Sequence, residues 1–403
     1  MYESRFLLWM GMLLFLLKMG ARRQLDFELD SPEALANLNR LSGCDQSDVA
    51  HHDTLDHYLG HVEPAEISAK IRHRMVHHLI RTKALDSERV MGHFMIGVDG
   101  TQELSFPERH CQYCLERTNG SKTLYYHNVL EAKLLTSKGL AISVGTEFIE
   151  NTDPEATKQD CELKAFTRLA AQLKRDFPQL RLCLSLDALY ANGSVLDICR
   201  QNRWKYIITF KKGSLPAVWQ EYQTLLELCP QNRKVHHPSP NCRQELAWVE
   251  NLQYIDDQGR QQQFHAFQCQ EQQGKDQRFF AWLTNFSVWA QNVAGLANRG
   301  GRLRWKIENE GFNVQKNGGF NLEHAYSKDD QKMKNFYLLL QIAHLILQLM
   351  EKGNLLGANV VKLFGSLYNL ARRLAESLRN HPIDAEALDS AAAARIQIRL
   401  HGL

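Results

Sequence analysis

The chain has 403 residues, of which 44% are hydrophobic and 23% are charged, and its formal net charge is +3 with a pI near 8.3. This length allows two or three domains, and the composition is that of an ordinary globular protein. The slightly basic balance permits a nucleic-acid partner without indicating one, because local patches decide such binding. Nine cysteines without a framework spacing favour a reducing cytoplasm over secretion.

The first element is an apolar run from Phe6 to Leu17. It is shorter than the about 20 residues that cross a bilayer, and basic residues follow it where a signal peptide would have its cleavage site. The run therefore predicts a buried helix, with a signal or membrane contact as the alternative. Residues 1–90 as a whole predict a helical N-terminal, DNA-binding region, from segments such as PEALANLNRL and PAEISAKIRHRMVHHLIRTKAL.

From residue 93 the pattern changes to strands. HFMIGVDG, TLYYHNVLEAKLL and LAISVGTEFI each predict a strand, and TSKG suggests a hairpin between the last two. DCELKAFTRLAAQLKRDF then predicts a helix, LRLCLSLDALY a strand, GSVLDICRQN a helix and WKYIITFKKG a strand. This order predicts an α/β fold with a mixed sheet and helices on its faces, the order of the ribonuclease-H-like fold.

The helix that should follow the last strand is delayed by a Gln-rich, strand-like stretch, which predicts a β-rich insertion. RWKIENEGFNVQKNGGFNLEHAYS, residues 304–327, reads as that delayed helix, and MKNFYLLLQIAHLILQLME predicts a core helix behind it. The expected division is therefore as follows: residues 1–90, helical N-terminal region; 91–215, first part of the catalytic core; 216–295, β-rich insertion; 296–352, second part of the core; 353–403, helical tail.

Two aspartates follow strands that this fold places side by side. Asp99 is expected at the end of the first strand and Asp187 at the end of the fourth, so that their carboxylates face one another. Two close carboxylates repel, and oxygen ligands of this kind suit Mg²⁺. Either aspartate alone would more often be a turn residue, and the specific signal is a third acid on the late helix.

Glu308 is the candidate for the third acid. Arg304 lies four residues earlier on the same helical face, where it could orient the carboxylate or touch a phosphate. Glu310 lies about 200° further round an ideal helix, so both glutamates cannot face the sheet. An Arg–Glu pair at this spacing is usually a solvated surface pair.

The stretches IGVDGTQ (96–102), SLDALYANG (185–193) and GRLRWKIENEGFNVQKNGG (301–319) resemble those of bacterial insertion-sequence transposases of the DDE type that carry a β-rich insertion before the catalytic Glu. The resemblance covers roughly residues 45–350. In this group the late helix follows Tyr-x2-Arg-x3-Glu-x6-Lys, which Arg304 and Glu308 fit. The Tyr position falls on Gly301 and the Lys position on Gln315, with Lys316 one residue late.

The resemblance implies that Asp99, Asp187 and Glu308 are the catalytic residues and hold two Mg²⁺ ions, for which Mn²⁺ can substitute. It implies hydrolysis of a phosphodiester at the element's end and attack of the freed 3′-hydroxyl on target DNA. The partners would be terminal inverted repeats and target DNA, bound by a homodimer in the bacterial cytoplasm at the nucleoid, with no membrane. The alternatives are a ribonuclease-H-like nuclease without strand transfer and a catalytically inactive, transposase-derived DNA-binding protein. A transporter or signalling protein is disfavoured, because the sequence has no membrane span or nucleotide loop.

The positive residues expected on DNA are Arg304, Lys316, Lys211 and Lys212. The two neighbouring lysines follow a strand with interleaved aromatic residues, which predicts either a DNA groove with base stacking or an ordinary strand with charged ends. Glu162 could be an auxiliary acid, although a surface role is favoured.

Two further groups could bind metal. HCQYC contains Cys111 and Cys114, with His110 and later His127, and a lone CxxC favours two reduced thiols in a loop over zinc. His57 and His61 share a helical face, and the pattern favours surface histidines there.

Overall fold

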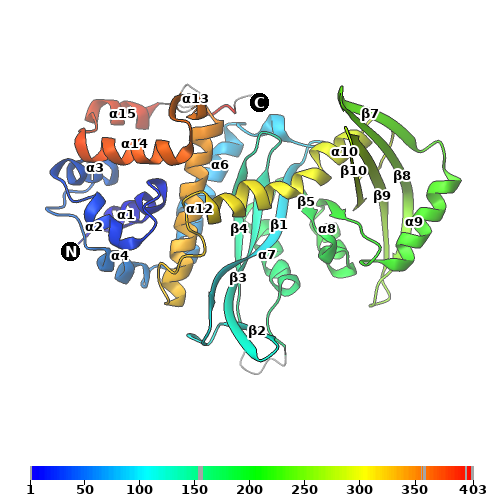
Figure 1. Ribbon diagram of the computed structural model, residues 1–403, viewed down its shortest axis with the longest axis horizontal. Coiled ribbons are helices and arrows are strands. Elements are labelled where there is room, and N and C mark those ends of the chain that lie inside the picture. The colour runs from blue at the N-terminus through cyan, green and yellow to red at the C-terminus, as the bar shows by residue number, and fades with distance from the viewer. Residues whose placement is uncertain (1, 153–157, 355, 357–359, 395–396, 401–403) are drawn as a thin grey trace.

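The protein is a mixed α/β structure, in which helices from both ends of the chain pack beside a long sheet (Figure 1). This computed structural model describes residues 2–152, 158–354, 356, 360–394 and 397–400. The strands are β1 (Phe94–Phe106), β2 (Leu115–Asn119), β3 (Lys122–Leu135), β4 (Ala141–Ile149), β5 (Leu182–Leu186), β6 (Lys205–Thr209), β7 (Arg233–Ser239), β8 (Cys242–Ile255), β9 (Gln261–Gln273) and β10 (Asp276–Thr284). The helices are α1 (Ser4–Leu16), α2 (Leu25–Glu28), α3 (Pro32–Ser42), α4 (His52–Leu59), α5 (Pro64–Ile67), α6 (His73–Arg81), α7 (Glu162–Asp176), α8 (Gly193–Gln201), α9 (Pro216–Leu228), α10 (Val293–Arg299), α11 (Val314–Asn317), α12 (Asp330–Lys352), α13 (Val360–Phe364), α14 (Leu367–Asn380) and α15 (Ala385–Ala393).

The apolar run at the start of the chain forms α1, and the prediction of a buried helix is confirmed. Phe6, Met10 and Phe15 are at most 1% exposed. Gly11 lets α1 approach α12 closely, because a Cβ at this position would lie 2.7 Å from Cδ1 of Leu339. Within the described part of the chain, no helix combines the length and apolar character needed to cross a membrane.

The sheet has ten strands in the order β2-β3-β1-β5-β6-β10-β9-β8-β7, and β4 pairs with β3. β1 is parallel to β5 and β5 is parallel to β6, whereas the other strand pairs are antiparallel. The predicted adjacency of the first and fourth core strands is therefore confirmed, because β1 pairs with β5 from Phe94–Leu182 to Gly97–Ser185. The mixed character of the sheet is confirmed as well.

Alternate residues of β1 pack into different apolar clusters. Phe94, Ile96 and Val98 lie in the cluster that contains the apolar face of α7, whereas Met95 packs in a cluster with Ile307. Successive side chains of a strand point to opposite faces, so α7 and the segment around residue 307 cover opposite faces of the sheet. The carboxyl ends of the parallel strands therefore lie between α7 on one face of the sheet and the segment around residue 307 on the other.

The expectation that the first strand ends at Asp99 is wrong. β1 continues to Phe106, and Asp99 lies inside its antiparallel ladder with β3, directly opposite Glu131. The long partner strand satisfies the backbone groups beyond Asp99, so the Asp-Gly sequence does not form a turn. Asp99 nevertheless lies two residues beyond the last pair between β1 and β5.

The late helix is shorter and less regular than expected. A 3₁₀ turn (Gly301–Arg304) leads through two helical residues into a π-helical segment (Ile307–Asn313) and then into α11, which ends at Asn317. Gly319 follows with φ of 85°, a left-handed conformation that glycine adopts at little cost, and residues 318–327 form no helix. Residues 304–327 are thus not one helix.

Residues 216–295 contain α9, strands β7 to β10 and the start of α10. Their strands are continuous with the rest of the sheet, because β10 pairs with β6 through Trp282–Thr209, Leu283–Ile208 and Thr284–Ile207. At the other end of the chain, α14 packs on the N-terminal helices, and Asn37 donates hydrogen bonds to the carbonyls of Leu378 and His381 at 2.8 Å each. The rest of the tail expected at 353–403 lies partly outside the described residues.

Candidate functional site

The three predicted acids come from three different elements: Asp99 from β1, Asp187 from the residue after β5, and Glu308 from the π-helical segment. Nη1 of Arg304 lies 3.4 Å from Oδ2 of Asp99 and 2.9 Å from Oε1 of Glu308, so one guanidinium nitrogen contacts both carboxylates. Asp187 directly follows β5 and caps a short 3₁₀ turn, accepting a hydrogen bond from the Leu189 backbone at 2.8 Å. Its charge acts on Asp99 across the two neighbouring strands.

The carboxyl of Asp99 has a raised pKa. Burial raises its pKa to about 7, Arg304 opposes the shift, and the negative charges of Glu308, Glu162 and Asp187 add to it. The site therefore combines several carboxylates with a single arginine between them. Such an excess of negative charge is costly unless a cation compensates it.

The donor set fits a hard divalent cation such as Mg²⁺, which prefers carboxylate oxygens. The three acids do not belong to any His/Cys/Asp/Glu group of the described residues whose ligand atoms all lie within 4.8 Å of one another. Arg304 separates Asp99 from Glu308, and a cation held by both would require this side chain to withdraw. Glu308 lies in the π-helical segment, an irregularity that is frequent at functional sites.

Glu162 belongs to this group of acids, and the favoured surface role for it is wrong. It is half-buried at the first position of α7, and a Cβ on Gly100 would lie 2.4 Å from its Oε1. The hydroxyl of Tyr190 donates a hydrogen bond to its Oε2 at 3.4 Å, and burial followed by the charge of Asp187 raises its pKa. The only sequence signal for this role is its place in the first turn of the helix that follows the three strands.

Next to the acids lies a cavity of about 450 Å³ that β10 helps to build. Lys211 and Lys212 are exposed at its rim, and Asp187 and Arg304 line it. Phe279 from β10 and Trp305 are also part of its wall, although both are 51% exposed. Exposed aromatic rings beside positive charges provide the surface that nucleic-acid strands use for stacking and phosphate contacts. Positive and aromatic side chains therefore flank the acids.

The aromatic residues interleaved in β6 do not form such a surface. Trp204, Tyr206 and Phe210 are at most 3% exposed and belong to the main apolar cluster. Lys205 donates a hydrogen bond to the carbonyl of Asn285 at 2.8 Å. For this strand the ordinary interpretation, a buried strand with charged ends, therefore holds.

The two positions that depart from the transposase pattern have structural roles. A Cβ on Gly301 would lie 2.3 Å from Nε1 of Trp282, so a tyrosine does not fit there. Gln315 is fully buried and donates hydrogen bonds to Gln341 and His344. Lys316 is partly exposed and forms an ion pair with Glu323 at 2.7 Å.

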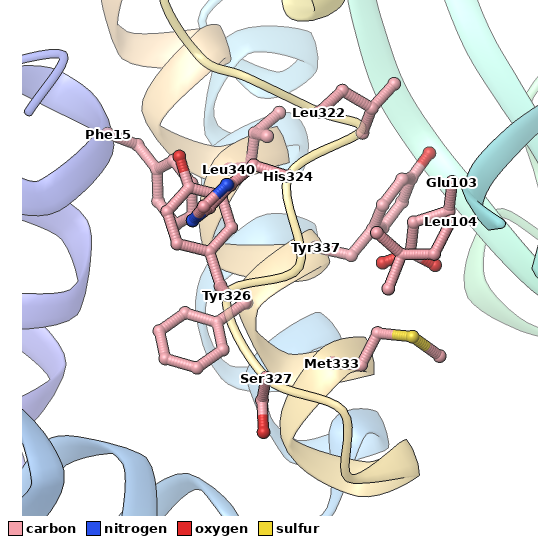
Figure 2. Close-up of a pocket in the computed structure, with 11 residues that line it drawn as sticks. Phe15, Glu103, Leu104, Leu322, His324, Tyr326, Ser327, Met333, Tyr337 and Leu340 are labelled. Atoms are coloured by element: carbon pink, nitrogen blue, oxygen red, sulfur yellow. The ribbon is translucent and has the colours of Figure 1, made fainter. Parts of the chain in front are cut away.

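A second, very small cavity of about 10 Å³ lies between the N-terminal helices, the loop before α12 and β1 (Figure 2). Phe15, Tyr326, Tyr337 and Leu340 make most of its wall apolar or aromatic, and Glu103 reaches it from β1. Burial raises the pKa of Glu103 well above its ordinary value, which favours the neutral form of this carboxyl. The cavity holds about one water molecule and has no room for a substrate.

No protein-family model matches this chain, and no curated protein matches it.

Proposed function

We propose that this chain is a DDE-type DNA transposase with a ribonuclease-H-like catalytic core. The single observation that carries the proposal is that Arg304 contacts both Asp99 and Glu308 while the charge of Asp187 acts on Asp99, with the three acids on three separate elements. The order β4-β3-β1-β5-β6, with only the last two pairs parallel, is also the order expected of such a core. The stretch from α9 to β10 then corresponds to the β-rich insertion.

Asp99, Asp187 and Glu308 would hold two Mg²⁺ or Mn²⁺ ions, which would activate the attacking oxygen and stabilise the leaving one at a phosphodiester. Asp99 lies on β1, which pairs with β5 before Asp187 and packs against Ile307, next to Glu308. Arg304 orients Glu308 and can turn to a DNA phosphate when its carboxylate partners are neutralised. Lys211 and Lys212 would contact the backbone of DNA lying in the adjacent cavity, and Lys316 would contact the element's end.

The activity requires paired element ends and a target, so the working unit would be a homodimer or larger assembly on DNA. The same acids would also serve a nuclease that cuts without joining. The two functions differ in their products, because only a transposase links the freed 3′-hydroxyl to a second DNA molecule.

The test uses DNA fragments that contain both borders of this gene, a supercoiled target plasmid, and the full chain with Mg²⁺ or with EDTA. A transposase gives border cleavage and joined product with Mg²⁺ and neither with EDTA. Border cleavage without joined product would identify a nuclease instead. Specific border binding without cleavage in either buffer would favour the inactive DNA-binding protein and contradict the proposal.

A further inference from the structure

Four potential metal ligands lie close together where the loop between β1 and β2 meets β3, outside the acidic site. His110 and Cys111 lie in the loop after β1, Cys114 lies just before β2, and His127 comes from β3. Their ligand atoms all lie within 4.8 Å of one another. The two histidines thus supply the second pair of ligands that the lone CxxC lacked.

The spacing of these atoms is close to that of a tetrahedral zinc site. Bond lengths of about 2.3 Å to sulfur and 2.0–2.1 Å to nitrogen place two sulfurs about 3.8 Å apart and sulfur and nitrogen about 3.6 Å apart. The Sγ atoms of Cys111 and Cys114 are 3.4 Å apart, and Nε2 of His127 lies 3.4 and 3.5 Å from them. Nδ1 of His110 lies 3.3 Å from Sγ of Cys114. Small outward shifts of the side chains would admit an ion.

The surroundings are those of a closed site. Cys114 and His127 are buried, and Cys111 and His110 are half-buried. Nε2 of His110 is buried without a hydrogen-bond partner among the described residues. Two sulfur and two nitrogen ligands with no open position are typical of structural zinc rather than catalytic zinc.

A second layer of charged groups supports His127. Its ring lies in a group with Glu150 and Asp330 whose ligand atoms are also within 4.8 Å of one another. Lys334 contacts these two carboxylates at 2.8 and 2.7 Å. A carboxylate that accepts the free ring N–H of a zinc-bound histidine fixes its tautomer and orientation, and Glu150 and Asp330 lie near enough to His127 to take this role.

We propose that His110, Cys111, Cys114 and His127 bind one Zn²⁺, which fixes the loop between β1 and β2 against β3. The favoured interpretation of the CxxC as a loop with two reduced thiols gives way to this one. The site is separate from the acidic centre, and the proposal does not depend on the transposase function.

The first test measures the zinc content of the full chain, purified without a histidine tag and without chelator. The wild-type chain is expected to contain about one zinc ion per molecule. The double variant Cys111→Ser/Cys114→Ser and the variant His127→Asn are expected to lose it. The matched control Cys44→Ser/Cys229→Ser removes two other free cysteines and should keep it. Zinc in the wild type no higher than in Cys111→Ser/Cys114→Ser would overturn the proposal.

A second measurement on the wild-type chain keeps the test decisive if the variants fold poorly. Zinc is removed under reducing conditions and replaced with Co²⁺, whose visible spectrum reports its coordination. The proposal predicts intense bands of a tetrahedral ion together with thiolate-to-cobalt charge-transfer bands, and competition by one equivalent of Zn²⁺. A weak octahedral spectrum, or no cobalt binding, would contradict it.

Discussion

Asp99 and Glu131 face each other across the ladder of β1 and β3, yet their surroundings differ sharply. Glu131 is fully buried, accepts a hydrogen bond from Thr146, and has Nζ of Lys133 3.5 Å from its Oε2. Arg72, also buried, donates to Thr146 and adds a second positive charge. Asp99 has one arginine and three neighbouring acids.

The difference separates a structural charge from a binding charge. Glu131 has two buried positive partners inside the fold. Burial lowers the pKa of Arg72 and of Lys133, and the negative charge of Glu131 counteracts both shifts. The charge around Asp99 is not balanced by the protein, so a cation from solution can supply the missing compensation. The charges around Glu131 stabilise the fold, whereas the uncompensated charges around Asp99 favour the binding of a cation.

The substitution with the largest expected effect on stability is Glu131→Gln. Removing this charge leaves Arg72 and Lys133 buried without their acidic partner, and loss of one partner of a buried pair costs about 3–5 kcal/mol. Urea denaturation measures the change in the free energy of unfolding. The exposed Glu250→Gln on β8 is the control and should change it little. Equal stability of the two variants would show that Glu131 is not a structural charge.

Asp99→Asn is expected to act in the opposite direction and to stabilise the protein without divalent ions. The pKa of Asp99 is about 7 when folded against an ordinary 3.8, so wild-type stability falls as the pH rises between these values. The variant should therefore match the wild type below about pH 4 and exceed it by roughly 1–4 kcal/mol above pH 7. Thermal or urea unfolding across this pH range tests it, with the exposed Asp257→Asn as control. A variant less stable than the wild type at pH 8 would refute the view that the charge is uncompensated.

Magnesium should reduce this difference in stability between Asp99→Asn and the wild type. A cation that binds only the folded state raises the free energy of unfolding by about 1.4 kcal/mol at ten times its dissociation constant. The wild-type chain should gain this stability in Mg²⁺, whereas Asp99→Asn should gain much less. Unfolding curves at increasing Mg²⁺ measure both, with Ca²⁺-free buffer and K⁺ at matched ionic strength as the control. An equal gain in both proteins would mean that the ion binds elsewhere.

The smallest effect is expected for the two lysines at the rim of the cavity beside the acids. Lys211→Ala/Lys212→Ala should weaken binding to border DNA and lower the slope of log affinity against log salt by about 2, one unit for each lost phosphate contact. Lys174→Ala/Arg175→Ala on exposed positions of α7 is the matched control. Fluorescence anisotropy at several salt concentrations measures the slopes. Identical slopes in the two double variants would remove these lysines from the DNA-binding surface.

Most elements of the fold could be predicted from sequence because each carries its own periodicity. The apolar alternation around β5 and the spacing of Leu169 and Leu173 on α7 are local signals. The end of β1 could not be predicted, because Asp-Gly suggests a turn and only the length of β3 keeps the strand extended. Likewise, the break after Asn317 depends on Gly319, which has a positive φ and where a Cβ would lie 3.0 Å from Cδ of Lys18.

The site could be predicted only in part, for a related reason. The pairing of Arg304 with Glu308 follows from helical spacing, and the adjacency of β1 and β5 follows from the fold class. The inward turn of Glu162 depends on the absence of a side chain at Gly100, a contact between residues 62 positions apart that no local pattern encodes. The meeting of His127 with the CxxC depends in the same way on the register of β3.

The most direct test of the account is the cleavage of border DNA by Asp187→Asn in Mg²⁺, beside the wild type and the control Asp257→Asn. This substitution keeps the size of the side chain and its place after β5 while it removes one carboxylate of the acidic site. The account predicts cleavage by the wild type and by the control, and loss of cleavage by Asp187→Asn with nearly unchanged binding to the border. Full cleavage by Asp187→Asn would contradict it.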